Sequence, residues 1–133
     1  MTGMTEESRT LYEVIGGEST VREMVDRFYD LMELETEFAV LRGVHGPSLD
    51  NARQRLFMFL SGWMGGPDLY VEAHGHPRLR MRHMPFGIGT EERDQWLRCM
   101  AWAMEDVGID VELRVRLMNS FFQTADWMRN KPD

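Results

Sequence analysis

The chain has 133 residues, which is the usual size of one domain and is enough to bury a core without disulfides. Its formal net charge of −7 argues against nucleic acid as a main partner, because binding phosphates requires a basic face. A single cysteine, Cys99, excludes an internal disulfide, and the first ten residues lack the basic and apolar runs of a secretory signal. No apolar run is long enough for a membrane span, so these features predict a cytoplasmic protein that does not use a membrane.

The N-terminal part of the chain is expected to be a tail followed by one short helix. Residues 1–9 are polar and aperiodic, so we expect them to be flexible, with one folded domain over residues 10–130. The sequence LYEVI over 11–15 predicts one or two helical turns, which Gly16 and Gly17 should end.

Three further segments are expected before the sequence GGP at residues 65–67. A helix over 19–32 is predicted to start with a capping box, in which Thr20 and Glu23 each bond the other's backbone N–H. Residues 33–44 predict a short helix or turn, because two glycines and a proline follow closely. The strongest amphipathic pattern runs over 49–63 and predicts a helix that ends at GGP.

The second half predicts a long irregular connection and two long helices. Residues 67–89 are expected to be mostly irregular, with a short helix over 77–83 before a proline. Helices are predicted over 90–107, with Thr90 as its N-cap, and over about 110–129. No window alternates with period two, so the predicted fold class is all-α. A connection of roughly twenty residues is long for a compact domain, and such loops are usually functional or disordered.

The long connection holds three of the four histidines of the chain, His74, His76 and His83. Imidazole suits zinc, copper or iron, so a metal site shared by the three histidines is one interpretation. Their spacing matches no established zinc pattern, and no cysteine or carboxylate stands at a supporting interval. The competing interpretation is therefore that they are loop histidines without a ligand.

His83 alone also fits a different site. A haem iron needs one axial imidazole, and the two haem propionates need cations at the rim of the pocket. Arg78, Arg80 and Arg82 precede this histidine, and helices rich in apolar and aromatic residues are expected on either side. The alternative is a histidine that stabilises the end of a short helix through the helix dipole.

Four linked motifs favour the haem site: GGP at 65–67, HGHP at 74–77, RMRHMPF at 80–86 and ERDQWLRCM at 92–100. In this order and spacing they resemble the group II truncated haemoglobins, and the resemblance covers nearly the whole chain. It implies an all-α, globin-like fold, a truncated two-over-two helical sandwich around one haem b.

The resemblance also implies roles for individual residues. His83 would be the proximal ligand of a five-coordinate haem iron. Tyr29 matches the distal tyrosine of the family and Trp96 the tryptophan typical of group II, and both would donate hydrogen bonds to a bound ligand. His45 falls at a helix corner where it is expected to be a third ligand-stabilising residue. Ala52 stands where many oxygen carriers have a distal histidine, so its small side chain should leave an open entrance.

Other side chains are expected to hold or surround the cofactor. Arg80 and Arg82 are candidates for the two propionates. Cys99 is expected to be a buried thiol and not a nucleophile, because it has no histidine beside it. His74 and His76 are expected to be loop structure. The side chains expected to pack against the porphyrin are Leu56, Phe59, Leu60 and Met100.

The resemblance implies a haem protein that binds dioxygen and other small ligands. Two or three distal donors would slow ligand release, which favours oxygen, nitric oxide or peroxide chemistry or sensing over bulk oxygen transport. Nitric oxide dioxygenase and peroxidase-like activities both fit, with carbon monoxide and sulfide as further ligands and a cellular reductase as partner. A monomer or homodimer is expected. Two alternatives stay open: a haem-free helical interaction module, and a non-haem metal site formed by the three histidines.

Overall fold

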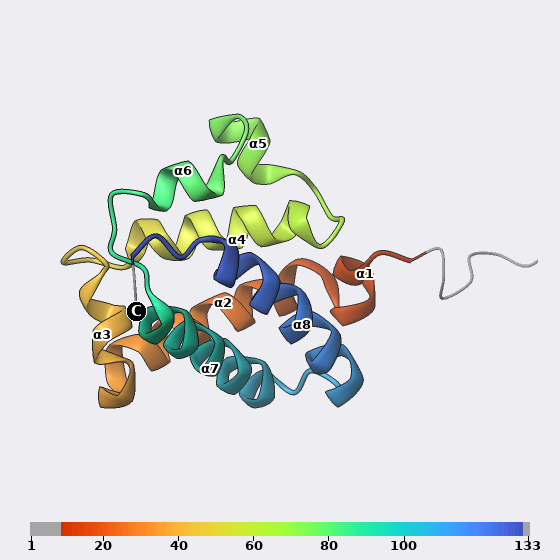
Figure 1. Cartoon of the computed structure of the whole chain (residues 1–133). Coiled ribbons are helices and arrows are strands. Elements are labelled where there is room, and N and C mark those ends of the chain that lie inside the picture. The colour runs from red at the N-terminus through yellow and green to blue at the C-terminus, as the bar shows by residue number, and fades with distance from the viewer. Residues whose placement is uncertain (1–8, 132–133) are drawn as a thin grey trace, which may run out of the picture.

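The computed structural model describes residues 9–131 and is built from helices, with no strand in that range, so the all-α prediction is confirmed (Figure 1). The predicted tail at residues 1–9 lies almost wholly outside the described residues. The helices are α1 (Leu11–Ile15), α2 (Gly17–Leu34), the 3-10 helix η2 (Thr36–Phe38), α3 (Ala39–Gly43), α4 (Asp50–Trp63), α5 (Leu69–His74), α6 (Leu79–His83), α7 (Thr90–Val107) and α8 (Val111–Trp127).

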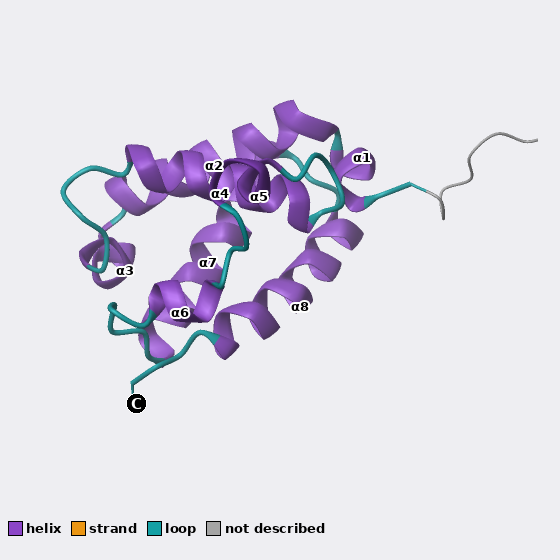
Figure 2. Cartoon of the chain, turned by 90° about the horizontal axis from the view of Figure 1, so that it is seen from above, coloured by secondary structure: helices purple, strands orange, loops and turns teal. Residues whose placement is uncertain are grey.

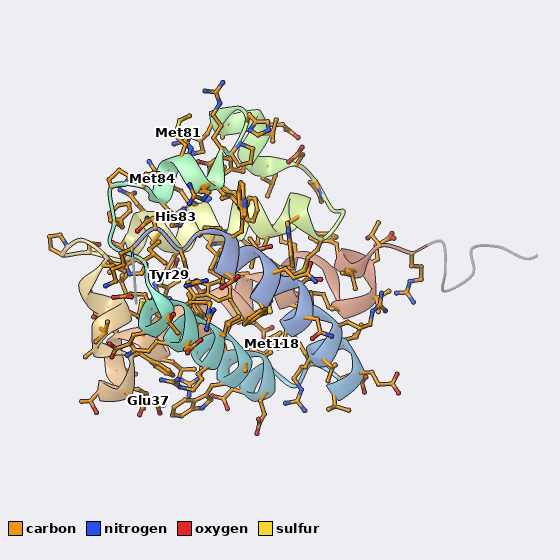
Figure 3. The ribbon with its side chains drawn as sticks, viewed as in Figure 1. Tyr29, Glu37, Met81, His83, Met84 and Met118 are labelled. Carbon is orange, nitrogen blue, oxygen red and sulfur yellow. The ribbon has the colours of Figure 1, made fainter. Side chains whose placement is uncertain are left out.

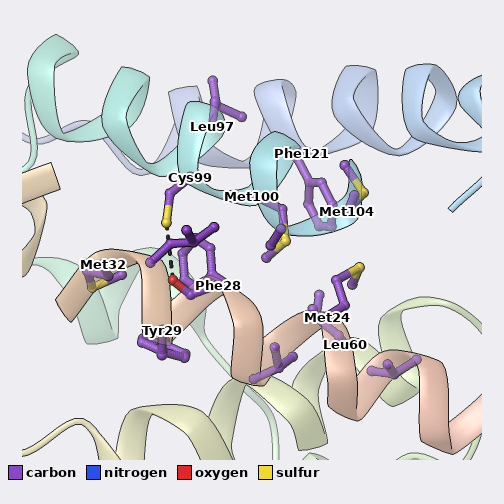
Figure 4. Packing of buried hydrophobic residues seen from close by; sticks show 14 of the residues in the cluster. Met24, Phe28, Tyr29, Met32, Leu60, Leu97, Cys99, Met100, Met104 and Phe121 are labelled. Carbon is purple, nitrogen blue, oxygen red and sulfur yellow. Dashed lines mark hydrogen bonds between the residues drawn. The ribbon is translucent and has the colours of Figure 1, made fainter. Parts of the chain in front are cut away.

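Two pairs of long helices form the body of the protein. Helix α2 packs against α4 and also against α7, and α7 packs against α8. The core lies where α2 meets α7, and it is rich in methionine and phenylalanine (Figure 4). Met24, Phe28 and Met100 have no exposed surface there. Thioether chains fill irregular gaps between helices well, which accounts for the use of so many methionines in this core.

The start of α2 differs from the sequence prediction. The helix begins at Gly17, and Gly16 precedes it with φ +119°, a left-handed conformation that favours glycine. A Cβ atom on Gly16 would collide with the Thr20 hydroxyl. Thr20 therefore lies inside the first turn, and the predicted capping box with Glu23 is wrong. A capping box does occur one helix earlier, between Thr10 and Glu13 of α1.

The start of α7 also differs in detail. Gly89 and not Thr90 is the N-cap residue, so the predicted Thr90 cap is wrong. The Gly89 N–H donates to Glu92 Oε1 over 2.8 Å. A carboxylate three residues into the helix thus accepts from the N-cap backbone, and its charge is favourable at the positive end of the helix dipole.

The connection between α4 and α7 is more ordered than predicted, because it contains α5 as well as the expected α6. Helix α5 has only six residues, and Tyr70 is its buried one, with its ring 6.5 Å from the ring of Phe59 on α4. Helices this short are marginal alone and depend on tertiary contacts. The sequence pattern within α5 is therefore too weak a signal to predict it.

Figure 2 shows the protein from above, with α6 and the chain that follows α8 close together on the same side. Helix α6 contributes no buried residue, so packing into the core does not hold it in place. None of the helices described over residues 9–131 is long and apolar enough to cross a membrane.

Candidate functional site

Four of the predicted site residues come from four different segments of the chain. Tyr29 lies on α2, His45 follows α3, Trp96 lies on α7 and His83 ends α6. The ring of Phe28 joins two of them, with its centroid 4.9 Å from that of Tyr29 and 5.1 Å from that of Trp96. The Tyr29 and His45 rings are edge to face at 5.9 Å. In Figure 3, His83 lies on the side of α6 toward Tyr29, while Met81 lies on the opposite side.

His83 is held in one tautomer by its own helix. Its Nδ1 lies 2.7 Å from the carbonyl oxygen of Leu79, and because a carbonyl only accepts, Nδ1 must carry the proton. In its neutral form, the half-buried ring then presents Nε2 with a free lone pair. Metal-bound histidines use this arrangement, in which a hydrogen bond at one nitrogen fixes the ring and raises the basicity of the other.

Tyr29 and Trp96 supply hydrogen-bond donors that nothing else uses. Tyr29 is only 5% exposed, and its hydroxyl has no hydrogen-bond partner among residues 9–131. The indole N–H of half-buried Trp96 likewise lacks a partner within this range. Burial raises the pKa of Tyr29, and the nearby Arg53 charge only partly opposes this, so the hydroxyl keeps its proton. Both side chains can therefore donate to a small molecule bound beside them.

His45 presents an acceptor rather than a donor in its neutral form. Its Nδ1 lies 3.0 Å from the carbonyl oxygen of Leu41, so Nδ1 donates and Nε2 keeps the lone pair. Burial lowers the pKa of His45; the hydrogen bond to Leu41 opposes the shift, and the charges of Arg42 and His83 add to it. His45 also lines a surface cavity of about 470 Å³, so it stands between this cavity and the Tyr29 ring.

Acidification is expected to destabilise the protein through His45. The unfolded chain binds a proton near the ordinary histidine pKa of 6.5, whereas folded His45 resists it until lower pH. The unfolded state therefore holds more protons just below this value, and the free energy of unfolding decreases as pH falls through it. Thermal unfolding between about pH 7.5 and 5.5 should show a smaller decrease in Tm for His45→Gln than for the native chain. His74→Gln, at an exposed position, is the control; parallel curves for native and His45→Gln would contradict the prediction.

The side chains expected to contact the cofactor fall into two groups. Leu60 and Met100 are buried, with at most 1% of their surface exposed, whereas Leu56 and Phe59 are half-buried against the core. Cys99 is a buried thiol, as predicted: it has no exposed surface, and its Sγ donates to the Phe28 carbonyl oxygen over 3.1 Å (Figure 4). Burial, with the charge of Glu37, raises the pKa of Cys99 to about 12, so the thiol stays protonated.

The two arginines predicted for the propionates bond to backbone carbonyls. Arg80 donates from Nε to the carbonyl oxygen of Trp127 and from Nη2 to that of Arg129, over 3.0 and 3.3 Å. Arg82 donates from Nε to the Pro77 carbonyl oxygen over 2.7 Å. Neither arginine forms an ion pair with a carboxylate of residues 9–131, so both charges remain available to an anion.

Sequence reasoning missed Arg53 on α4, which lies beside the site. Its guanidinium lies 5.9 Å from the centre of the Tyr29 ring and donates to Asp30 Oδ1 over 2.7 Å and to the Asp26 carbonyl oxygen over 3.0 Å. These bonds hold α4 against α2 beside the tyrosine. The sequence feature that could have indicated Arg53 was the pair Asp26 and Asp30, which are four residues apart on one helix face with Tyr29 between them.

The three-histidine metal site is not formed. Over residues 9–131, no group of three or more histidine, cysteine, aspartate or glutamate side chains is placed to hold a metal ion. His74 and His76 are both exposed, and His74 instead packs at 4.9 Å against the ring of Tyr70.

Comparison with known proteins agrees with this architecture. A family model described as bacterial-like globin matches residues 10–130. The Group 2 truncated hemoglobin YjbI of Bacillus subtilis (strain 168) is 38% identical over 122 residues, which are 92% of this chain and 89% of that protein.

Solved structures give the same result at the level of the fold. The group II 2-on-2 hemoglobin of Agrobacterium tumefaciens has a TM-score of 0.92 at 41% identity and covers 97% of this chain and 100% of its own. The cold-adapted truncated hemoglobin of Pseudoalteromonas haloplanktis TAC125 has a TM-score of 0.89 at 45% identity, and it covers 93% of this chain and 100% of its own. The chain therefore belongs to the bacterial-like globin family, in its group II truncated, or 2-on-2, branch. Membership implies a haem cofactor and the binding of small ligands at it.

The residues present fit a haem. His83 offers a nitrogen lone pair on a ring fixed by Leu79, and Tyr29 and Trp96 offer unused donors. Arg80 and Arg82 offer positive charge for carboxylates. This set combines a ligand for iron, cations for propionates and donors for an iron-bound ligand, which are the groups that a haem pocket requires.

Proposed function

We propose that this globin holds one haem b through His83 and binds small ligands on the side of Tyr29, Trp96 and His45. The haem would supply an iron that binds dioxygen, nitric oxide, carbon monoxide, peroxide or sulfide and that can change oxidation state. The observation that carries the proposal is the His83 ring, with Nδ1–H bonded to Leu79 and Nε2 left free.

The distal residues would decide how firmly a ligand is held. Tyr29 and Trp96 have unused donors, and in a water-poor pocket each hydrogen bond to a partly charged ligand contributes about 1–3 kcal/mol. Neutral His45 adds an acceptor, so it would orient the Tyr29 hydroxyl or a protonated ligand instead of donating to dioxygen.

Firm retention favours chemistry or sensing over delivery of oxygen. A carrier must release its ligand readily, and two donors on one ligand oppose release. We therefore place the protein among haem proteins for oxygen, nitric oxide or peroxide chemistry, with a cellular reductase to return ferric iron to ferrous. Small, half-buried Ala52 would leave the distal entrance open.

A haem-free interaction module is the second candidate. Its support is the set of exposed large apolar side chains, among them Met81 at 63% and Trp127 at 61%. The unused donors of Tyr29 and Trp96 have no purpose in such a module, so the haem protein fits these residues better.

Hemin titration with visible absorption spectroscopy tests the proposal. One equivalent of hemin should give a strong Soret band, which shifts on reduction with dithionite and again on addition of carbon monoxide. A folded, helical protein that takes up no hemin would overturn the haem function and favour the interaction module.

A further inference from the structure

The chain that follows α8 is bonded to the segment that carries His83. In Figure 1 its blue end meets the green connection between α6 and α7, and Figure 2 shows the same proximity from above. We call residues 127–131, that is the last residue of α8 and the four that follow it, the C-terminal strap. Because α6 buries no residue, the bonds made by this strap take the place of core packing.

Asn130 is the centre of the strap. Its side-chain Nδ2 donates to the carbonyl oxygen of His83 over 3.0 Å, and its Oδ1 accepts from the N–H of Ile88 over 2.9 Å. Its backbone N–H donates to the carbonyl oxygen of Ile88 over 2.8 Å. A carbonyl can only accept and an N–H only donate, so the two partners dictate which way the amide points.

Further bonds secure the strap on both sides of Asn130. Arg80 donates to the carbonyl oxygens of Trp127 and Arg129. Lys131 Nζ bonds Glu92 Oε2 over 2.8 Å, and its aliphatic chain lies so close to the loop that a Cβ on Gly89 would come within 2.8 Å of Lys131 Cε. The strap therefore joins α6, the loop after it and the start of α7.

We infer that the C-terminal strap sets the position of the His83 ring relative to the iron, with Asn130 as the positioning residue. The inference rests on the proposed role of His83 as iron ligand. The ring is attached to a five-residue helix whose His83 carbonyl accepts from the Phe86 N–H within its own turn and from Asn130 Nδ2 across the strap. Loss of the Asn130 bond leaves the turn intact but removes its tie to the strap, so the helix end can tilt. A tilted imidazole bonds iron less directly, which weakens the iron–nitrogen bond and shortens haem retention.

Asn130→Asp is the sharpest test, because it replaces the donor toward His83 with an oxygen and leaves the size of the side chain unchanged. In the haem-loaded protein we expect a shifted iron–histidine vibration in resonance Raman spectra of the reduced form. Haem transfer to apomyoglobin should become faster by up to about tenfold, the effect of one lost hydrogen bond. Asn119→Asp, the same change at an exposed position on α8, is the matched control and should alter neither quantity.

A second variant keeps the test decisive. Asn130→Ala removes both bonds without adding a charge, and it should shift the vibration in the same way if Asn130→Asp folds poorly. An unchanged vibration in folded variants overturns the inference even if their Tm falls, because a merely structural role moves stability alone. A native protein that binds haem but shows no iron–histidine vibration, or binds no haem, shows instead that the proposed function fails and the inference with it.

Discussion

His83→Ala is expected to abolish stable haem binding. His83 is the half-buried histidine whose Nε2 is left free by the 2.7 Å bond from Nδ1 to Leu79. Loss of a partner that only orients a metal ligand costs about 10- to 100-fold in affinity, so loss of the ligand itself should cost more than about 100-fold. Hemin titration should then give a weak, broad Soret band in place of the strong one expected for the native chain.

Two matched controls distinguish the loss of an iron ligand from the loss of any histidine in this connection. His76→Ala removes a histidine whose ring is exposed and accepts a hydrogen bond from the Arg78 N–H. It should bind hemin as the native protein does, and His74→Ala should do the same. Equal loss in all three variants would favour a shared histidine site over a single iron ligand. Added imidazole should restore part of the Soret band of His83→Ala, since it can enter the space left by the side chain.

Tyr29→Phe is expected to accelerate dioxygen dissociation from the reduced, haem-loaded protein. The substitution removes a hydroxyl that has no partner among residues 9–131, and it keeps the buried ring that packs on Phe28. One hydrogen bond to a charged group contributes about 1.5–3 kcal/mol, which corresponds to a dissociation rate about 10- to 150-fold higher. Stopped-flow mixing of the oxygenated protein with excess carbon monoxide measures this rate.

Carbon monoxide provides an internal comparison, because it carries less negative charge than dioxygen when bound and gains less from a donor. Its dissociation should change by a smaller factor in the same variant. Tyr12→Phe, a matched change on α1, which lies before the start of α2, should change neither rate. If dioxygen leaves Tyr29→Phe at the native rate, the hydroxyl is not directed at the ligand and Trp96 alone would act as donor.

The long helices were predictable because their signal is periodic. Helices α2, α4, α7 and α8 each repeat apolar residues over several turns, which was enough to predict them. The buried face matched less well in α4, where Phe57 is buried and the expected Leu56 and Phe59 are only half-buried. Short elements were not predictable in this way. Helix α5 depends on the contact of Tyr70 with α4, and the start of α2 depends on the left-handed conformation of Gly16, which no local pattern encodes.

Only those residues of the candidate site that match positions in the family sequence pattern could be proposed from the sequence. Tyr29, Trp96 and His83 were proposed from the resemblance, and in the structure they offer unused donors and a free lone pair; their roles stay predictions. Arg53 and Asn130 were not identified. Their bonds span 23 residues to Asp30 and 47 residues to His83, and a contact over such a separation exists only after the chain has folded.

That separation of 47 residues between His83 and Asn130 has a consequence during biosynthesis. A ribosome adds roughly 5–20 residues per second, so the amide that holds the histidine is made about 2–10 seconds after the histidine itself. During this interval the short helix α6 has neither buried side chains nor the strap to hold it. The ring of His83, the proposed iron ligand, therefore reaches its final position only after the segment around Asn130 has been synthesised and has folded back onto α6.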